Sequence, residues 1–192
     1  SVQGLGGRGG LCWLSAEECD FGYRSSRFQQ YPEDIITAIR LNLTKAGHIK
    51  IDYPDLARYF QGHADVTPKQ IAAAVIDIRS AKLPDPSVNP NVGSFFKNPV
   101  VSAELVETIR ALGLDAYLEG DGYKLSAAQL IDYCGWKDKP AEKVACWPNQ
   151  ALVLVNQGGA KAADVLTYAA AIRADVQARL GVALVQEPTK IQ

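Results

Sequence analysis

The stretch NVGSFFKNP, residues 91–99, places a glycine and a serine before two adjacent phenylalanines, and a lysine, an asparagine and a proline after them. Two aromatic side chains bury a large apolar area on folding, yet their neighbours are polar or conformationally permissive. We interpret GSFFKNPVV, residues 93–101, as a strand that starts from a turn. The stretch therefore combines a core anchor with unusual hydrogen-bonding capacity.

In a regular strand, Ser94, Phe96 and Asn98 would lie on one face. A hydroxyl and an amide on one face form a plausible polar site, and Gly93 would let a ligand or a flat ring approach the backbone closely. An ordinary turn that enters a strand explains the same residues, and spacing alone favours that simpler interpretation.

Helix signals flank this stretch on both sides. Upstream, Thr67 is a predicted N-cap, Pro68 takes the first helical position and Gln70 closes a capping box. A shorter helix is expected near residues 53–60. Downstream we expect three helices: residues 103–112 after Ser102 and before Gly113, a second that Ser126 and Gln129 open with a capping box and Gly135 ends, and a third over residues 161–180 before Gly181.

Short apolar runs predict strands at residues 11–14, 35–43 and 151–155, the last with the continuous apolar character of a buried strand. Together with the helices they indicate an α+β or α/β fold with a mixed sheet. The two prolines of LPDP stop any helix, and we expect a domain boundary at about residues 82–90.

Residues 1–10, SVQGLGGRGG, contain five glycines and formally match a dinucleotide-binding fingerprint. That motif needs a strand before it and a helix after it, whereas three residues precede it here and a strand-like run follows. We therefore expect a flexible linker or a segment left by cloning.

Composition excludes several classes of function. The chain has 192 residues, 47% of them hydrophobic, with 20 basic and 21 acidic side chains, so no charge excess favours nucleic acid or an anionic membrane surface. No apolar run approaches the length of a membrane span. The four cysteines lack C-x-x-C spacing and nearby histidines, which favours reduced structural thiols over a metal site.

Four segments together resemble one known family in the same order. They are KLPDPSVNPNVGSFFKNPVVSAE (residues 82–104), FGYRSSRF (21–28), NQALVLVN (149–156) and L-x-x-E at residues 184–187. The resemblance is to UDP-N-acetylenolpyruvoylglucosamine reductase, the flavoenzyme that completes UDP-N-acetylmuramate in peptidoglycan synthesis. It implies that NADPH reduces FAD and that hydride then passes to the enolpyruvyl double bond of a UDP-sugar.

The resemblance assigns the catalytic roles to three residues. Ser94 matches the family's proton donor, and neighbouring groups must assist it because a serine is a weak acid. Arg24 matches the arginine that stabilises the substrate carboxylate, and Glu187 matches a glutamate that organises the proton path. Without the resemblance, Arg24 would be a surface ion-pair residue and Glu187 a solvated charge near a chain end.

The resemblance also implies the binding residues. Lys82 matches a lysine at the UDP diphosphate, where a mobile point charge suits the task, and Tyr53 matches a tyrosine that closes over it. Asn98 and Gln150 match amide contacts to the substrate. We further assign Arg24 and Gly93 to the flavin, and we expect no metal. Each of these polar residues could equally be an ordinary exposed side chain.

We expect part of the FAD-binding domain at residues 11–81, the substrate domain at 82–184 and a closing segment at 185–192 that returns to the flavin domain. The family's glycine-rich loops over the FAD pyrophosphate have no match in residues 1–16, so we expect weak FAD binding. A catalytically incompetent fragment or a non-catalytic UDP-sugar-binding module is the alternative. The resemblance otherwise implies a cytoplasmic monomer that serves cell-wall biogenesis, cell shape and cell division.

Overall fold

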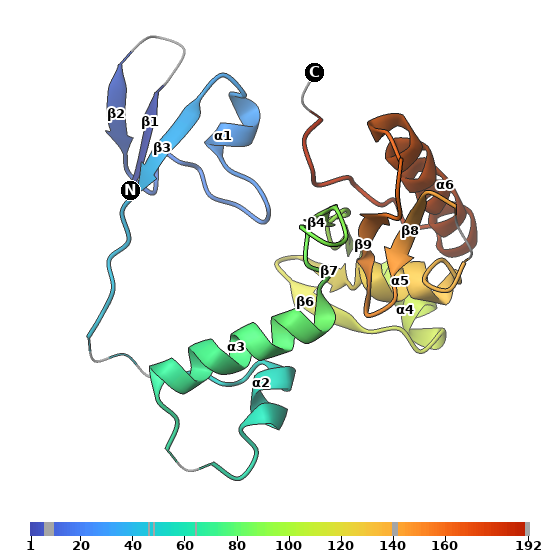
Figure 1. Cartoon of the computed structure of the whole chain (residues 1–192), viewed down its shortest axis with the longest axis horizontal. Helices are drawn as coiled ribbons and strands as arrows, with labels where there is room; N and C mark the ends of the chain where they lie inside the picture. Colours follow the sequence, from blue (N-terminus) through green and yellow to red (C-terminus); the bar gives the residue numbers. More distant parts are fainter. Residues whose placement is uncertain (6–9, 46, 48, 64, 140–141, 191–192) are drawn as a thin grey trace. The chain divides into compact units, whose positions relative to one another are not determined.

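The structure is a computed structural model, and it describes residues 1–5, 10–45, 47, 49–63, 65–139 and 142–190. The chain divides into two compact units, residues 1–49 and residues 50–192, and each is described by itself (Figure 1). The predicted α+β class is confirmed. Instead of the mixed sheet that we expected, the described strands form three small sheets in which every pairing is antiparallel.

The first unit is a three-stranded sheet with a short helix. The strand order is β2-β1-β3, formed by β1 (Val2–Leu5), β2 (Leu11–Leu14) and β3 (Ile35–Ile39), and α1 (Arg27–Gln30) precedes β3. The expected linker over residues 1–10 is therefore wrong for β1, which pairs with a strand on each side and buries Val2. Gly6 and Gly9 of the rejected fingerprint lie outside the described residues.

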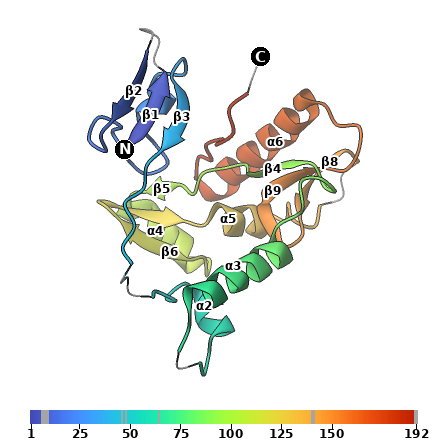
Figure 2. The same ribbon diagram turned by 60° about the vertical axis from the view of Figure 1, so that its left-hand side comes forward.

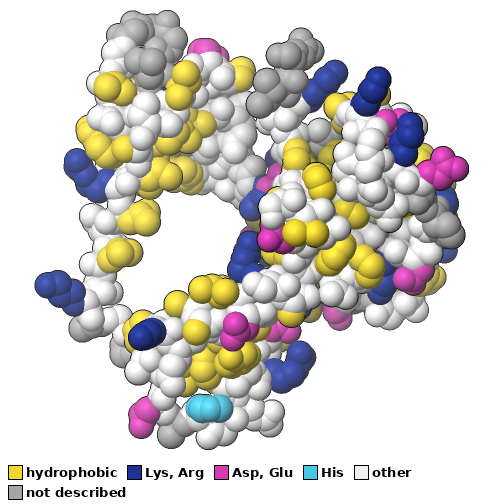
Figure 3. All heavy atoms as spheres, viewed as in Figure 1, with side chains coloured by type: hydrophobic (Ala, Val, Ile, Leu, Met, Phe, Trp, Pro, Cys, Tyr) yellow, Lys and Arg dark blue, Asp and Glu magenta, His cyan; other side chains and the backbone are white. Residues whose placement is uncertain are grey.

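Apolar side chains remain exposed on this first unit, where Figure 3 shows hydrophobic atoms gathered over the sheet. They come from β2 and β3 and are Leu11, Trp13, Ile35, Ile36 and Ile39. The sheet thus leaves much of its apolar surface in solvent.

The second unit begins with two helices that contact one another, α2 (Pro54–Tyr59) and α3 (Pro68–Lys82). Both were predicted, and the capping box of α3 is present: Thr67 Oγ1 accepts from the Gln70 backbone N–H at 3.3 Å, and the Gln70 side chain accepts from the Thr67 N–H at 2.8 Å. A phenol-to-carboxylate hydrogen bond of 3.0 Å from Tyr59 to Asp77 links the two helices.

Two sheets follow in the second unit, with the strand orders β4-β9-β8 and β5-β7-β6. The first is formed by β4 (Asn91–Ser94), β8 (Val144–Trp147) and β9 (Gln150–Asn156), and the second by β5 (Val100–Val101), β6 (Ala116–Glu119) and β7 (Gly122–Leu125). The buried strand expected at residues 151–155 is confirmed as β9. Strands β6, β7 and β8 were not predicted.

Three helices complete this unit: α4 (Ala103–Ala111), α5 (Ala127–Tyr133) and α6 (Ala162–Leu180). All three were predicted, and Gly113 and Gly181 end their helices with φ of 77° and 69°, as expected of C-terminal glycines. The predicted reciprocal capping box of α5 is half formed. Ser126 accepts from the Gln129 N–H, but the Gln129 amide pairs with Asp115 at 2.7 Å instead of reaching back.

The main core lies where α5 and α6 pack against β8 and β9, an arrangement that can be followed in Figure 2. Ile131 and Ile172, one from each helix, are fully buried in it. The Trp136 indole donates to Asp175 of α6 at 2.8 Å, which satisfies a polar group at the edge of this apolar core.

The strand alternation predicted for residues 93–101 is wrong. Strand β4 ends at Ser94, and both Phe95 and Phe96 are buried, with their rings edge to face at a centroid separation of 5.2 Å. Residues 95–97 are bordered on both sides: the Phe95 N–H donates to Leu152 O at 2.8 Å, and the Lys97 N–H donates to Val185 O at 2.9 Å.

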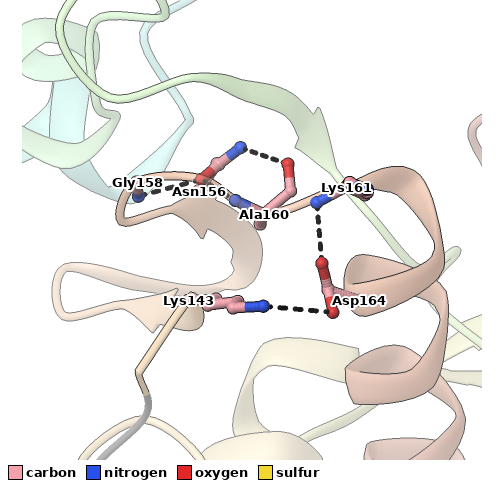
Figure 4. A network of polar contacts seen from close by, with 6 residues as sticks. All are labelled: Lys143, Asn156, Gly158, Ala160, Lys161 and Asp164. Carbon is pink, nitrogen blue, oxygen red and sulfur yellow. Dashed lines mark hydrogen bonds and ion pairs between the residues drawn. The ribbon is translucent and has the colours of Figure 1, made fainter.

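The connection from β9 to α6 is held by one amide side chain (Figure 4). Asn156 Oδ1 accepts from the N–H groups of Gly158 and Ala160 at 2.9 and 3.2 Å, and Nδ2 donates to Ala160 O at 3.0 Å. At the start of α6, Asp164 accepts from the Lys161 N–H at 2.8 Å and lies 3.9 Å from the Lys143 ammonium. These contacts fix where the longest helix begins.

We predict that Ile172→Ala lowers the free energy of unfolding by about 2–5 kcal/mol, because it opens a cavity in a close-packed core. Ile76→Ala in α3 is the matched control: Ile172 is 0% exposed, whereas Ile76 is 64% exposed. We expect the control to change stability by less than about 0.5 kcal/mol. Urea unfolding followed by circular dichroism measures both, and equal losses would contradict the placement of the core.

Candidate functional site

A cavity of about 410 Å³ in the second unit brings together four of the residues that the sequence singled out. They are Tyr53, Lys82, Ser94 and Gln150. The remaining lining residues are mostly apolar and come from α2, from α3 and from the residue that follows α3: Leu56, Val75, Ile78, Arg79 and Leu83. Among the described residues the cavity thus combines an apolar wall with two cations, a hydroxyl, a phenol and an amide.

Each of these four residues stands at the end of an element. Tyr53 is the N-cap residue of α2 and is exposed, and Lys82 is the last residue of α3. Ser94 ends β4, where it pairs with Val153, and Gln150 opens β9. The antiparallel pairing of β4 with β9 therefore brings the hydroxyl and the amide to one cavity, although they are far apart in the sequence.

Lys82 does not stand alone at this cavity. Its ammonium forms an ion pair with the carboxylate of Asp55 in α2, and Arg58 Nη1 lies 3.4 Å from the other oxygen of the same carboxylate. The hydrogen bond from Lys82 holds the pKa of the Asp55 carboxyl below its ordinary value. Asp55 therefore stays charged at neutral pH, and the pair is lost only as the pH falls through that lowered pKa.

Gly93 has a φ of +75°, and a Cβ built on it would meet no atom within 4 Å. Its N–H donates to Asn91 Oδ1 at 2.9 Å, which fixes the left-handed turn just before Ser94. The open face fits the approach of a flat ring to the backbone. Gly93 also lines a neighbouring cavity of about 510 Å³, which shares Arg79 and Leu83 with the first.

Glu187 lies on a short segment that pairs with residues 95–97. Its N–H donates to Phe95 O at 2.9 Å, and Gln186 forms a bridge with Phe96. The backbone of Glu187 is thus hydrogen-bonded to the residue that follows Ser94. The first residues of the segment 185–192, which we expected to return to the flavin domain, pair with residues 95–97 of the second unit.

Asn98 is not one of the described residues that line the cavity. Its Oδ1 accepts from the Ala127 N–H at 3.0 Å, at the first turn of α5. This hydrogen bond satisfies one of the backbone donors that a helix leaves open at its N-terminus. The structure therefore gives Asn98 a structural role that the sequence did not suggest.

Arg24 lies in the first unit, in a tight turn closed by reciprocal hydrogen bonds of 2.9 and 3.2 Å between Gly22 and Ser25. Its φ is 51°, an uncommon value for a residue other than glycine. Arg27, three residues later, forms an ion pair with Asp34 at 3.3 Å.

All four cysteines are free thiols; Cys12 is exposed, and Cys19, Cys134 and Cys146 are buried. Burial raises the pKa of the Cys146 thiol to about 11. Within the described part of the chain, no group of three or more His, Cys, Asp or Glu side chains is placed to hold a metal ion.

Two charged residues of the site escaped the sequence analysis. Arg79 lines both cavities, and Asp55 pairs with Lys82. Arg79 lies three residues before Lys82 on one helix, a spacing that puts both on neighbouring positions of one face and could have indicated it. Asp55 belongs to a different helix, so its pairing with Lys82 depends on the packing of α2 against α3.

A family model described as UDP-N-acetylenolpyruvoylglucosamine reductase, C-terminal domain, matches residues 85–191, which is more than half of the chain. The chain belongs to this family. The match includes Gly93, Ser94 and the segment that carries Glu187, so the family assignment rests on the second unit.

Curated members of the reductase family match along most of the chain. The UDP-N-acetylenolpyruvoylglucosamine reductase of Alcanivorax borkumensis is 46% identical over 182 residues, which cover 91% of this chain and 52% of that protein. The proteins of the same name from Paraburkholderia phytofirmans and Bordetella pertussis are each 44% identical and cover 94% and 93% of this chain. The chain spans about half the length of these relatives.

A solved UDP-N-acetylenolpyruvylglucosamine reductase from Thermus caldophilus shares the fold, with a TM-score of 0.55 and 24% identity. The alignment covers 97% of this chain and 50% of that one. Among the helices that the structure describes, none combines the length and the apolar character that crossing a membrane requires.

We predict that Asn98→Ala lowers the free energy of unfolding by about 1 kcal/mol, because it removes the acceptor for the first turn of α5. Asn149→Ala is the matched control, since its hydrogen bond to Ala81 O is exposed. Thermal unfolding followed by circular dichroism should show a lower Tm for Asn98→Ala only. An unchanged Tm would contradict the capping role of Asn98.

Proposed function

We propose that this chain carries the substrate-binding part of a UDP-N-acetylenolpyruvoylglucosamine reductase. Its substrate is UDP-N-acetylglucosamine enolpyruvate, which the reaction converts to UDP-N-acetylmuramate for peptidoglycan synthesis. The observation that carries the proposal is the single cavity lined by Tyr53, Lys82, Ser94 and Gln150. The family of the chain and the names of its relatives support it.

The chemistry of the cavity suits a nucleotide-sugar. Lys82 supplies a cation for the diphosphate, and the Tyr53 ring can close over it from the start of α2. The Gln150 amide offers both a donor and an acceptor, and the apolar side chains of α3 face the less polar parts of the ligand. Asn98 is proposed as a further amide contact to the substrate, although its Oδ1 accepts from the first turn of α5 and it does not line this cavity.

Reduction of the enolpyruvyl group requires a proton and stabilisation of negative charge, which we assign to three residues. Ser94 donates the proton from the end of β4, and Glu187, whose backbone is bonded to Phe95, assists this transfer. Arg24 binds the substrate carboxylate with its planar guanidinium as charge develops there.

The proposal includes FAD and NADPH as cofactors. Reduced FAD supplies the hydride when it is bound. The open backbone face of Gly93 fits contact with its ring, and Arg24 is the second residue that we assign to it. Two residues supply only part of a flavin site.

A non-catalytic module that binds a UDP-sugar without flavin is the second candidate. It is favoured by the composition of the cavity, whose lining residues suffice for the nucleotide-sugar while the flavin contacts assigned here are few. In either case we propose a cytoplasmic monomer whose partner is a small molecule rather than nucleic acid.

We predict that Lys82→Ala weakens binding of UDP about 10- to 100-fold, because one charge-assisted contact to the diphosphate is lost. Lys69→Ala, an exposed lysine on the same helix, is the control and should leave the Kd unchanged. Titration calorimetry measures all three forms. The same Kd for wild type and Lys82→Ala would remove Lys82 from the binding site.

We predict that Ser94→Ala affects the two half-reactions differently. Rapid mixing measures both, with the chain joined to the part of a relative that lies outside the match. Flavin reduction by NADPH should be nearly unchanged, whereas oxidation of the reduced flavin by substrate should slow about 10²- to 10⁴-fold, because the proton donor is gone. Ser94→Cys should recover part of the loss, since a thiol is more acidic. Equal slowing of both half-reactions would assign Ser94 to flavin position or folding.

A further inference from the structure

Asp55 already forms an ion pair with Lys82, the cation that the proposed function assigns to the diphosphate. Its side chain is 17% exposed and that of Lys82 is 44% exposed, so the pair lies at the rim of the cavity rather than deep inside it. Lys82 itself lines the cavity, whereas Asp55 contacts it from α2. An anion that enters the cavity therefore meets Lys82 already paired with a carboxylate.

A second cation is in place beside Asp55. Arg58 Nη1 lies 3.4 Å from Oδ1, whereas Lys82 pairs with Oδ2, so each oxygen faces a different cation. Arg58 is one helical turn after Asp55 and its side chain is 76% exposed. If Lys82 leaves, the carboxylate keeps a partner without any movement of the backbone.

The other charged groups of these two helices are arranged differently. Asp77 of α3 accepts from the Tyr59 phenol of α2, which raises the pKa of that phenol. Arg79 lines the cavity on the same side as Lys82. The carboxylate facing Lys82 is thus Asp55, and its lowered pKa keeps it charged throughout the neutral range.

We propose that Asp55 is the resident counter-ion of Lys82, and that an anionic ligand displaces it onto Arg58 when it binds. This inference rests on the proposed function, because it takes the ligand to be a nucleoside diphosphate. A ligand must carry enough negative charge to compete with a carboxylate that is already bound. Asp55 therefore sets how strongly the site discriminates a charged nucleotide from a neutral nucleoside.

The electrostatic consequence has a definite sign. While Asp55 is charged, it repels an approaching diphosphate and also holds one of the three donors of the Lys82 ammonium. Removal of the charge strengthens anion binding, and salt screens the effect because the pair lies near the surface. Binding of uncharged uridine does not use Lys82 and is unaffected.

The experiment is titration calorimetry of the full chain with UDP and with uridine, at low and at high salt. We expect Asp55→Asn to tighten UDP binding about three- to tenfold at low salt and less at high salt, with uridine unchanged. Asp77→Asn removes a carboxylate from the same helix pair that does not face Lys82, so it should leave both affinities unchanged. In a Lys82→Met background, Asp55→Asn should tighten UDP binding less than it does in the wild type, because the direct repulsion is then the only part of the effect that remains.

A second variant tests the displacement itself. Arg58→Gln leaves Asp55 without its alternative partner and should weaken UDP binding, the opposite of the Asp55→Asn result. If wild type binds UDP but Asp55→Asn weakens it or leaves it unchanged, the inference is wrong and the proposed function stands. An equal gain in the Lys82→Met background would also overturn the inference. If no form binds UDP, the proposed function fails and the inference fails with it.

Discussion

The burial of two adjacent phenylalanines is the constraint on which the second unit depends. Neighbouring residues of a regular strand point to opposite faces, so Phe95 and Phe96 can pack against each other only where the strand stops. The chain accordingly leaves β4 at Ser94 and runs between β9 and the segment that begins at Val185. One short stretch thereby joins the middle and the end of the unit, and it leaves a hydroxyl at the cavity.

Much of the fold could be predicted wherever the information is local. The caps of α3 and the stop of α6 at Gly181 are set by neighbouring residues, and both are present. Strand β1 could not be predicted, because glycines in a short sequence resemble a linker until two other strands pair with it. Strands β6 and β7 could not be predicted for the same reason. They form a hairpin whose stability comes from strand pairing and packing rather than from its composition.

Part of the candidate site could be predicted from the sequence and part could not. Tyr53, Lys82, Ser94 and Gln150 were named from a family resemblance, and the structure places them around one cavity although they come from four elements. What the sequence could not show is which charges neutralise one another. The ion pair between Asp55 of α2 and Lys82 of α3 depends on how the two helices pack. The spacing of residues along the sequence does not predict such a pair. The roles of Arg24 and Glu187 stay predictions that rest on the resemblance.

The uneven burial of the thiols has a practical consequence for studying the chain. A maleimide or an iodoacetamide reacts with a thiolate, so the buried Cys146, with its pKa raised to about 11, offers almost no nucleophile near neutral pH. Cys12 on β2 is the one exposed thiol of the four. A dye or spin label added to the unmodified sequence would thus attach chiefly to the first unit, and its signal would report on that unit while ligands are added to the other.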